Sequence, residues 1–130
     1  MMVIKALREL NYRPKAVYGC EVWRNLDWLN DKDKIIFNVS GNKKLEEDLL
    51  KVFDSQITGG KLYDKATIGR RLSNATFSET TEIDSAESMI YAMDLTPLIY
   101  DHTININSFI KEHIYNFSND VDLLISDLNT

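Results

Sequence analysis

The sequence predicts a single α/β domain over residues 1–130, with about three strands flanked by helices and an amphipathic helix at the C-terminal end. A chain of 130 residues can build one core but not two. Its apolar fraction of 44% and charged fraction of 27% are usual for globular proteins. Stretches with apolar residues at helical spacing and stretches rich in β-formers follow one another in the order α-β-β-α-α-β-α. This order indicates helices that cover a small sheet.

The first part of the chain contains one predicted helix and two predicted strands. Apolar residues at helical spacing predict a helix over 3–10, which Pro14 helps to end. Residues 15–24 (KAVYGCEVWR) and 34–40 (KIIFNVS) are rich in β-formers and are predicted strands. The polar stretch 25–33 between them is typical of a loop.

An amphipathic helix is predicted over residues 44–56 (KLEEDLLKVFDSQ). Acidic residues in its first turns suit the positive end of the helix dipole, and a Gly-Gly pair follows its end. The residues near its apolar face are Leu45, Leu49, Val52, Phe53 and Gln56.

The rest of the chain predicts two further helices and one strand. A less regular helix is expected over 63–75, and the acidic stretch 78–87 has no regular pattern. A strand is expected over 89–95, and a helical pattern runs from 105 to the end. The run 118–120 (SND) favours turns and could divide this last helix in two.

Charge, cysteine content and hydropathy argue against several classes of protein. The net charge of −5 argues against a nucleic-acid partner, which usually needs a clustered basic face. One cysteine, Cys20, cannot form an intrachain disulfide, and its place in a predicted strand favours a small core residue. No apolar run approaches the roughly 18 residues of a membrane helix, and the N-terminus is too charged for a signal peptide. We therefore expect a cytoplasmic protein with no membrane partner.

A family pattern runs through about residues 12–121. Taken in order and spacing, its segments resemble the C-terminal part of PIG-L/LmbE-type (N-acetylglucosaminyl deacetylase-like) proteins. The segments are 12–24 (YRPKAVYGCEVWR), 26–29 (LDWL), 53–57 (FDSQI), 59–61 (GGK), 63–64 (YD), 66–71 (ATIGRR), 74–77 (NATF) and 91–98 (YAMDLTPL).

The resemblance implies a Rossmann-like fold and a zinc-dependent hydrolase that removes an acetyl group from an N-acetylated sugar or a similar amide. In that family an HPDD-type motif and a later histidine hold the zinc, upstream of the part that this chain resembles. This sequence has no HPDD segment, and its only histidines are His102 and His113. Because a catalytic zinc needs about three protein ligands, we expect no metal ligand and no catalytic residue in this chain. The sheet would then be a partial Rossmann-like sheet, and whether the chain is an enzyme stays open.

Five candidate substrate-binding residues follow from the first predicted strand and the loop after it. Glu21, Trp23 and Arg24 come at the end of the strand, where ligands gather in open α/β sheets. Asp27 and Trp28 lie in the polar loop, where an indole can stack on a sugar and a carboxylate can accept hydroxyl hydrogen bonds. The alternative is ordinary packing of both indoles, with the charged groups in solvent.

Arg70 and Arg71 complete the candidate substrate-binding set. An arginine pair can bind a carboxylate or a phosphate. Adjacent helix positions point about 100° apart, so a salt bridge to an acidic residue is the favoured alternative. Asp101-His102 lacks an accompanying nucleophile, and His113 lies among apolar helix neighbours, so neither histidine is expected to be catalytic.

Three functions remain open at the level of sequence. The first is the C-terminal segment of a zinc-dependent deacetylase, inactive alone and partnered by an N-terminal catalytic half. The second is a standalone, non-catalytic binding or assembly module that forms a homo-oligomer because a partial sheet leaves an edge to cover. The third is an enzyme of another class, but the sequence contains no nucleophile elbow, P-loop or C-x-x-C pair.

Overall fold

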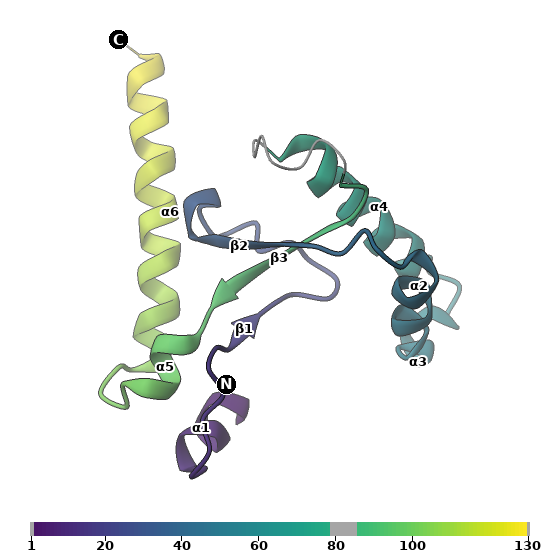
Figure 1. Ribbon diagram of the computed structural model, residues 1–130. Coiled ribbons are helices and arrows are strands. Elements are labelled where there is room, and N and C mark those ends of the chain that lie inside the picture. The colour runs from purple at the N-terminus through teal and green to yellow at the C-terminus, as the bar shows by residue number, and fades with distance from the viewer. Residues whose placement is uncertain (1, 79–85, 130) are drawn as a thin grey trace. The chain divides into compact units, whose positions relative to one another are not determined.

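The computed structural model describes residues 2–78 and 86–129 and has a mixed α/β architecture (Figure 1). A three-stranded sheet and several helices agree with the predicted class. The elements in chain order are α1 (Met2–Glu9), β1 (Tyr18–Gly19), the 3-10 helix η1 (Asp31–Asp33), β2 (Lys34–Asn38), α2 (Lys43–Lys51), α3 (Asp54–Ile57), α4 (Tyr63–Phe77), β3 (Met89–Asp94), α5 (Thr96–Tyr100) and α6 (Ile106–Leu128).

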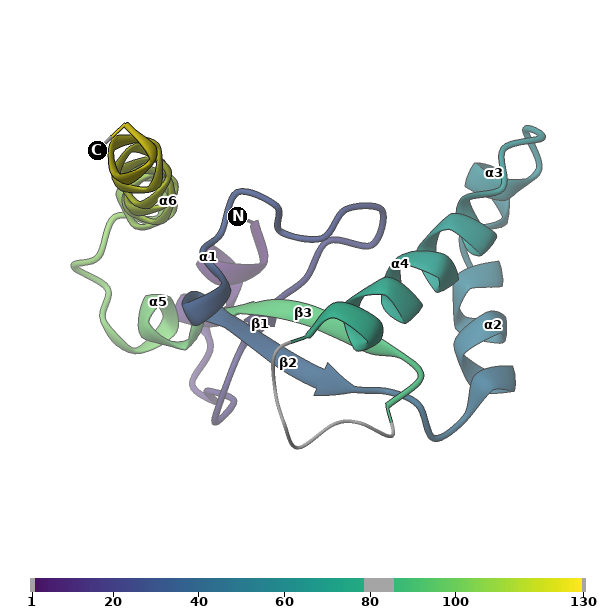
Figure 2. The same cartoon turned by 90° about the horizontal axis from the view of Figure 1, so that it is seen from above.

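The sheet has the strand order β1-β3-β2 (Figure 2). β1 pairs with β3 in the antiparallel sense, with Tyr18 opposite Asp94 and Gly19 opposite Met93. Beyond the end of β2, the Val39 N–H donates to the Ser88 carbonyl at 2.9 Å. The described sheet is small, open and antiparallel, so a Rossmann-like parallel arrangement is not present among the described strands.

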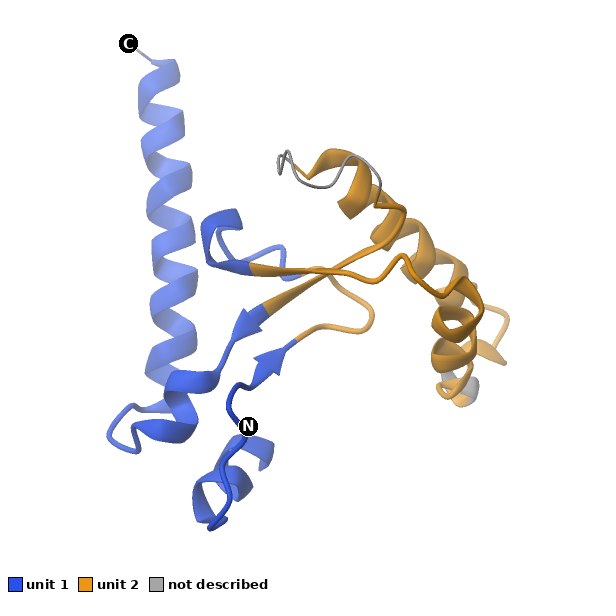
Figure 3. Cartoon of the chain, viewed as in Figure 1, with its two compact units in different colours: residues 1–19, 26–34, 93–130 blue, residues 20–25, 35–92 orange. Residues whose placement is uncertain are grey.

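The chain divides into two compact units (Figure 3). Unit 1 consists of residues 1–19, 26–34 and 93–130, and unit 2 consists of residues 20–25 and 35–92. The chain crosses between the units several times, so neither unit is a continuous segment.

The core of unit 1 consists of two clusters that share Leu95 and Phe109. Ile4, Leu98 and Ile99 form one cluster and hold α1 against α5. Arg8 of α1 strengthens this contact, since its guanidinium donates to carbonyls at the end of α5 and beyond it, including Ile104 at 2.9 Å. The second cluster contains Leu26, Leu29 and Met93.

The long helix α6 begins after Asn105, whose side chain accepts a hydrogen bond from the Ser108 N–H at 3.1 Å. It continues unbroken through 118–120, so this run does not divide the helix in two. Serine, asparagine and aspartate each lower helix stability by only a fraction of a kcal/mol, about 0.7 or less, and no proline or glycine is present to stop the ladder. Several apolar residues of its second half are exposed, among them Leu123 and Leu124.

The predicted strand over 15–24 is mostly wrong, because only Tyr18–Gly19 is a strand. High β-propensity needs a neighbouring strand, and this segment leaves the sheet after Gly19. A side chain at Gly19 would place its Cβ 2.7 Å from Leu95 Cδ1, so the Leu95 side chain would have to move to admit it. Cys20 is exposed and lies outside any strand, so its expected core role is also wrong.

The predicted helix 44–56 is divided into α2 and α3, and α2 does not bury its apolar face. Leu45, Leu49 and Val52 are 52%, 58% and 77% exposed, whereas Glu46 and Leu50 are 8% and 2% exposed. The reason is polar pairing, since the buried Glu46 carboxylate accepts hydrogen bonds from other parts of unit 2. The amphipathic pattern alone therefore predicted the wrong face of α2 to be buried.

The remaining elements follow the sequence closely. α4, expected over 63–75, spans Tyr63–Phe77, and β3, expected over 89–95, spans Met89–Asp94. The stretch 78–87 was expected to have no regular structure, and its residues 79–85 lie outside the described part of the chain. Pro97 lies in the first turn of α5, where its missing N–H breaks no helical hydrogen bond.

Candidate functional site

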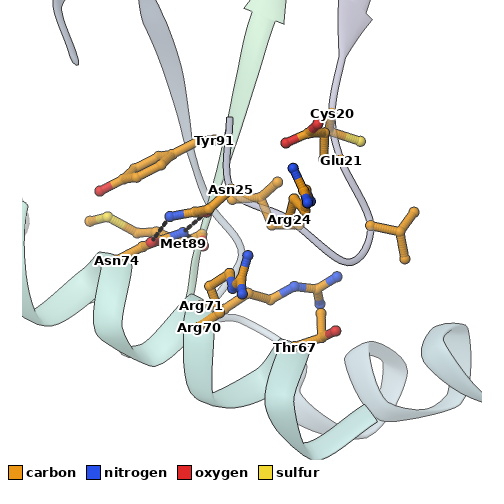
Figure 4. Close-up of a pocket in the computed structure, with 12 residues that line it drawn as sticks. Cys20, Glu21, Arg24, Asn25, Thr67, Arg70, Arg71, Asn74, Met89 and Tyr91 are labelled. Carbon is orange, nitrogen blue, oxygen red and sulfur yellow. Dashed lines mark hydrogen bonds between the residues drawn. The ribbon is translucent and has the colours of Figure 1, made fainter. Parts of the chain in front are cut away.

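Unit 2 contains a small pocket between the segment 20–25, helix α4 and the beginning of β3 (Figure 4). Its cavity volume is about 50 Å³. Four of the seven predicted substrate-binding residues line it, namely Glu21, Arg24, Arg70 and Arg71. The other lining residues are Cys20, Val22, Asn25, Thr67, Asn74, Met89, Ile90 and Tyr91.

Asn74 of α4 organises the floor of the pocket. Its side chain is buried, and it exchanges two amide hydrogen bonds of 2.7 and 2.9 Å with Asn25, 49 positions away in sequence. Its second N–H donates to the Met89 carbonyl at 3.1 Å. The segment 20–25 has no ladder partner of its own, so this amide pair ties it to α4 and β3. Figure 4 shows the paired amides between α4 and the segment.

Arg71 forms one wall of the pocket and is held by an ion pair. Its Nη1 lies 2.8 Å from Glu46 Oε1, and the side chains are 18% and 8% exposed. Ser88 Oγ donates to the same carboxylate oxygen at 2.8 Å. This is the acidic partner that the alternative interpretation of the arginine pair expected, and it fixes the guanidinium of Arg71 in place.

Arg24 and Arg70 differ from Arg71, because neither has a hydrogen-bond or ion-pair partner among residues 2–78 and 86–129. Arg70 is half-buried and Arg24 is exposed. In Figure 4 the side chains of all three arginines extend into the space between the segment 20–25 and α4. The pocket therefore presents guanidinium donors that are not used within the described part of the protein.

Trp23 does not line this pocket and has a packing role. Its ring makes an edge contact with Phe53, with centroids 5.5 Å apart, and a tilted contact with Tyr63 at 5.2 Å. Aromatic pairs at such distances contribute about 0.5–1.5 kcal/mol beyond their buried area. Trp23 thus anchors the segment that carries Arg24 and Glu21.

Asp27 and Trp28 belong to unit 1 and line no part of the pocket in unit 2. Asp27 is exposed at the rim of a separate hollow in unit 1 that also contains Lys32 and Asp120, which form an exposed ion pair of 3.0 Å. Trp28 packs against the cluster of Leu26, Leu29 and Met93. The contacts of Trp28 are those of a loop anchored by one indole.

The two histidines lie in unit 1. His102 is exposed, with Nε2 3.1 Å from the guanidinium of Arg13. His113 packs edge-on against Phe109 and lies 3.6 Å from the Asp33 carboxylate. Within residues 2–78 and 86–129, no three His, Cys, Asp or Glu side chains are grouped to hold a metal. The described residues do not fit a zinc site, and no catalytic step is assigned to them.

Sequence reasoning missed Asn25, Thr67 and Asn74 as pocket residues. One feature could have indicated Asn74, because asparagine is a weak helix former and is costly in a buried helix position unless it is hydrogen-bonded. Thr67 and Asn25 carry no such feature, since their role depends on segments that meet only in the folded unit.

Comparisons of the chain with known protein families, with curated proteins and with solved structures found no match. No helix in the part of the chain that the structure describes has both the length and the apolar character required to cross a membrane.

Proposed function

We propose that this chain is the C-terminal, substrate-binding segment of a PIG-L/LmbE-like zinc-dependent N-deacetylase that hydrolyses the amide of an N-acetylated sugar or a similar small molecule. In this proposal the chain is inactive alone, and the zinc ligands and further strands of a Rossmann-like sheet come from a metal-binding N-terminal half. The proposal places the protein in the cytoplasm.

The observation that carries this proposal is the pocket in unit 2. Glu21 and Arg24 come from the segment 12–24 of the family resemblance, and Arg70 and Arg71 come from the segment 66–71. These residues line one cavity together with the buried residues Thr67 and Asn74. In small-molecule sites, a few convergent polar groups fix the orientation of the ligand.

The exposed face of α2 supports the expectation of a further partner. Leu45 and Leu49 lie one turn apart on α2, Val52 is the residue that caps its C-terminal end, and all three are more than half exposed. Contiguous apolar residues on a protein surface usually mark an interaction site. A catalytic half that covers this face would remove it from water.

The test is to isolate the native polypeptide from its source cells with an antibody against this segment. We expect a polypeptide well above 15.0 kDa, or a complex with a second chain, that contains zinc and releases acetate from an N-acetylated sugar. Chelation of the metal should abolish acetate release. A native species of 15.0 kDa without a zinc-binding partner and without activity would overturn the proposal.

A second candidate function is a standalone assembly module, and the same exposed face of α2 favours it. In that case the 15.0 kDa chain should form a dimer or larger oligomer through this face. Light scattering should then show a monomer for Leu49→Asp and an unchanged oligomer for Leu123→Asp, which introduces the same charge at another exposed leucine, on α6. A monomeric wild-type chain would contradict the module.

A further inference from the structure

We infer that the pocket in unit 2 binds a small oxyanion, a carboxylate or phosphate group, between the guanidinium groups of Arg24 and Arg70. The inference rests on the proposed function for one point, which is the identity of the whole ligand. Under that function the ligand would be an N-acylated small molecule with an anionic substituent. The binding of the oxyanion itself depends only on the described residues of unit 2.

The distribution of charge is the first argument. The chain has a net charge of −5, yet three of its five arginines line this one pocket, and none of its ten lysines does. Glu21 is the one acidic residue of the lining, so cationic groups are in excess. Arginine presents a planar fork of donors that matches the oxygens of a carboxylate or phosphate.

The second argument is that two of these three cations have no internal partner. The charge of Arg71 is compensated by Glu46 at 2.8 Å. Arg24 and Arg70 have no such partner in the described ranges 2–78 and 86–129. Arg70 is half-buried and lines the pocket, so an anion that enters the pocket would gain from pairing with its guanidinium.

Thr67 is the third argument, because this pocket residue makes no side-chain hydrogen bond within the described part of unit 2. The residue is 7% exposed, lines the pocket, and has no side-chain hydrogen bond to any residue that the structure describes. Thr76 on the same helix shows the usual alternative, since its hydroxyl donates to the Leu72 carbonyl at 2.8 Å. A bound oxyanion would accept the hydrogen bond that Thr67 has not made internally.

The size of the cavity selects the ligand group. Its volume of about 50 Å³ exceeds the roughly 10–15 Å³ that one water needs and is far below the roughly 300–1,000 Å³ of pockets that enclose a whole ligand. The pocket can therefore hold a group of a few atoms while the rest of the ligand lies outside. The amide pair of Asn25 and Asn74 holds the two walls of the pocket together before the group binds.

The experiment titrates the full chain with inorganic phosphate and, separately, with acetate at constant ionic strength, and follows the Thr67 amide and the arginine Nε–H signals by NMR. We expect saturable shifts in these signals. Arg70→Gln and Arg24→Gln should each weaken binding by about tenfold or more, because each removes charge-assisted hydrogen bonds. Lys65→Gln is the matched control, since Lys65 is an exposed residue of α4 outside the pocket, and binding should change less than about twofold.

Tighter binding of phosphate than of acetate assigns a phosphate group, and the reverse assigns a carboxylate. Equal weakening by Lys65→Gln and by the two pocket variants, or the absence of saturable shifts at Thr67, would overturn the inference. Arg24 is an exposed residue, so Arg24→Gln keeps the test informative if Arg70→Gln disturbs folding. The titration needs neither zinc nor a second chain. It can therefore fail while the native polypeptide releases acetate, and it can succeed while the native polypeptide does not.

Discussion

Replacing Arg71 with methionine should strongly destabilise unit 2. The substitution keeps the apolar stem of the side chain and removes the charge that lies 2.8 Å from Glu46. Glu46 is 8% exposed, so its carboxylate would stay buried without a cation. Removing one partner of a buried ion pair costs about 3–5 kcal/mol. Ser88 still donates to this carboxylate, and Arg71 is 18% exposed, so we expect the lower end, about 3 kcal/mol.

The assay is urea unfolding followed by tryptophan fluorescence. Trp28 belongs to unit 1, so a Trp28→Phe background leaves Trp23, which packs on Phe53 and Tyr63, to report on unit 2. For a small protein, urea lowers the free energy of unfolding by about 1–3 kcal/mol per molar. A loss of about 3 kcal/mol should therefore lower the midpoint by about 1–3 M urea.

Two controls separate the buried pair from a general charge effect. Lys51→Met removes a cation from an exposed pair with Asp48, where the side chains are 64% and 51% exposed, and should cost less than about 1 kcal/mol. The double variant Glu46→Gln with Arg71→Met removes both charges and should be less destabilised than Arg71→Met alone. An effect of Arg71→Met as small as that of Lys51→Met would refute the assignment of Arg71–Glu46 as a buried ion pair.

Two further predictions concern hydrogen bonds. Asn74→Ala should lower the stability of unit 2 by about 2–3 kcal/mol in the same assay, because it removes the two bonds to Asn25 and the bond to the Met89 carbonyl; a loss below that of Lys51→Met would contradict this. Hydrogen bonds from the hydroxyl and the backbone N–H of Thr103 hold the pKa of Asp101 below its ordinary value of 3.8. Because the folded pKa is depressed, the stabilising contribution is present above pH 3.8 and is lost as the pH falls through the folded pKa. Thr103→Val should raise that pKa in a carboxyl NMR titration, and an unchanged midpoint would show that the hydroxyl is not the main cause.

Local pattern was sufficient where an element's own residues decide its structure. The long helical apolar spacing from residue 105 predicted α6, which the structure shows to be capped by Asn105, and the strand expected over 89–95 is β3. The pattern failed where a strand needs a neighbour, as in 15–24, because only Tyr18–Gly19 finds a place beside β3. It also failed for the face of α2, because helical periodicity does not include the gain from pairing Glu46 with Arg71.

For the candidate site, the sequence indicated some of the residues but not the other residues that line the same pocket. We predicted Glu21 and Arg24 from their place at the end of a predicted strand, and Arg70 and Arg71 as a pair that can bind an anion. The pocket that these four residues line also contains Thr67 and the Asn25–Asn74 pair. The hydrogen bonds between Asn25 and Asn74, which are 49 positions apart, cannot be predicted from a local stretch of sequence, because they form only when the two segments fold together.

The sequence by itself determined the α/β class, the positions of the main helices and β3, and the absence of an HPDD-type metal motif from the chain. These properties depend on composition and on spacing within about 20 residues. Only the tertiary structure decided which arginine is neutralised and which are available to a ligand. Charge compensation is set by distance in space. Arg71 differs from its neighbour Arg70 because it lies 2.8 Å from Glu46, which belongs to a different helix.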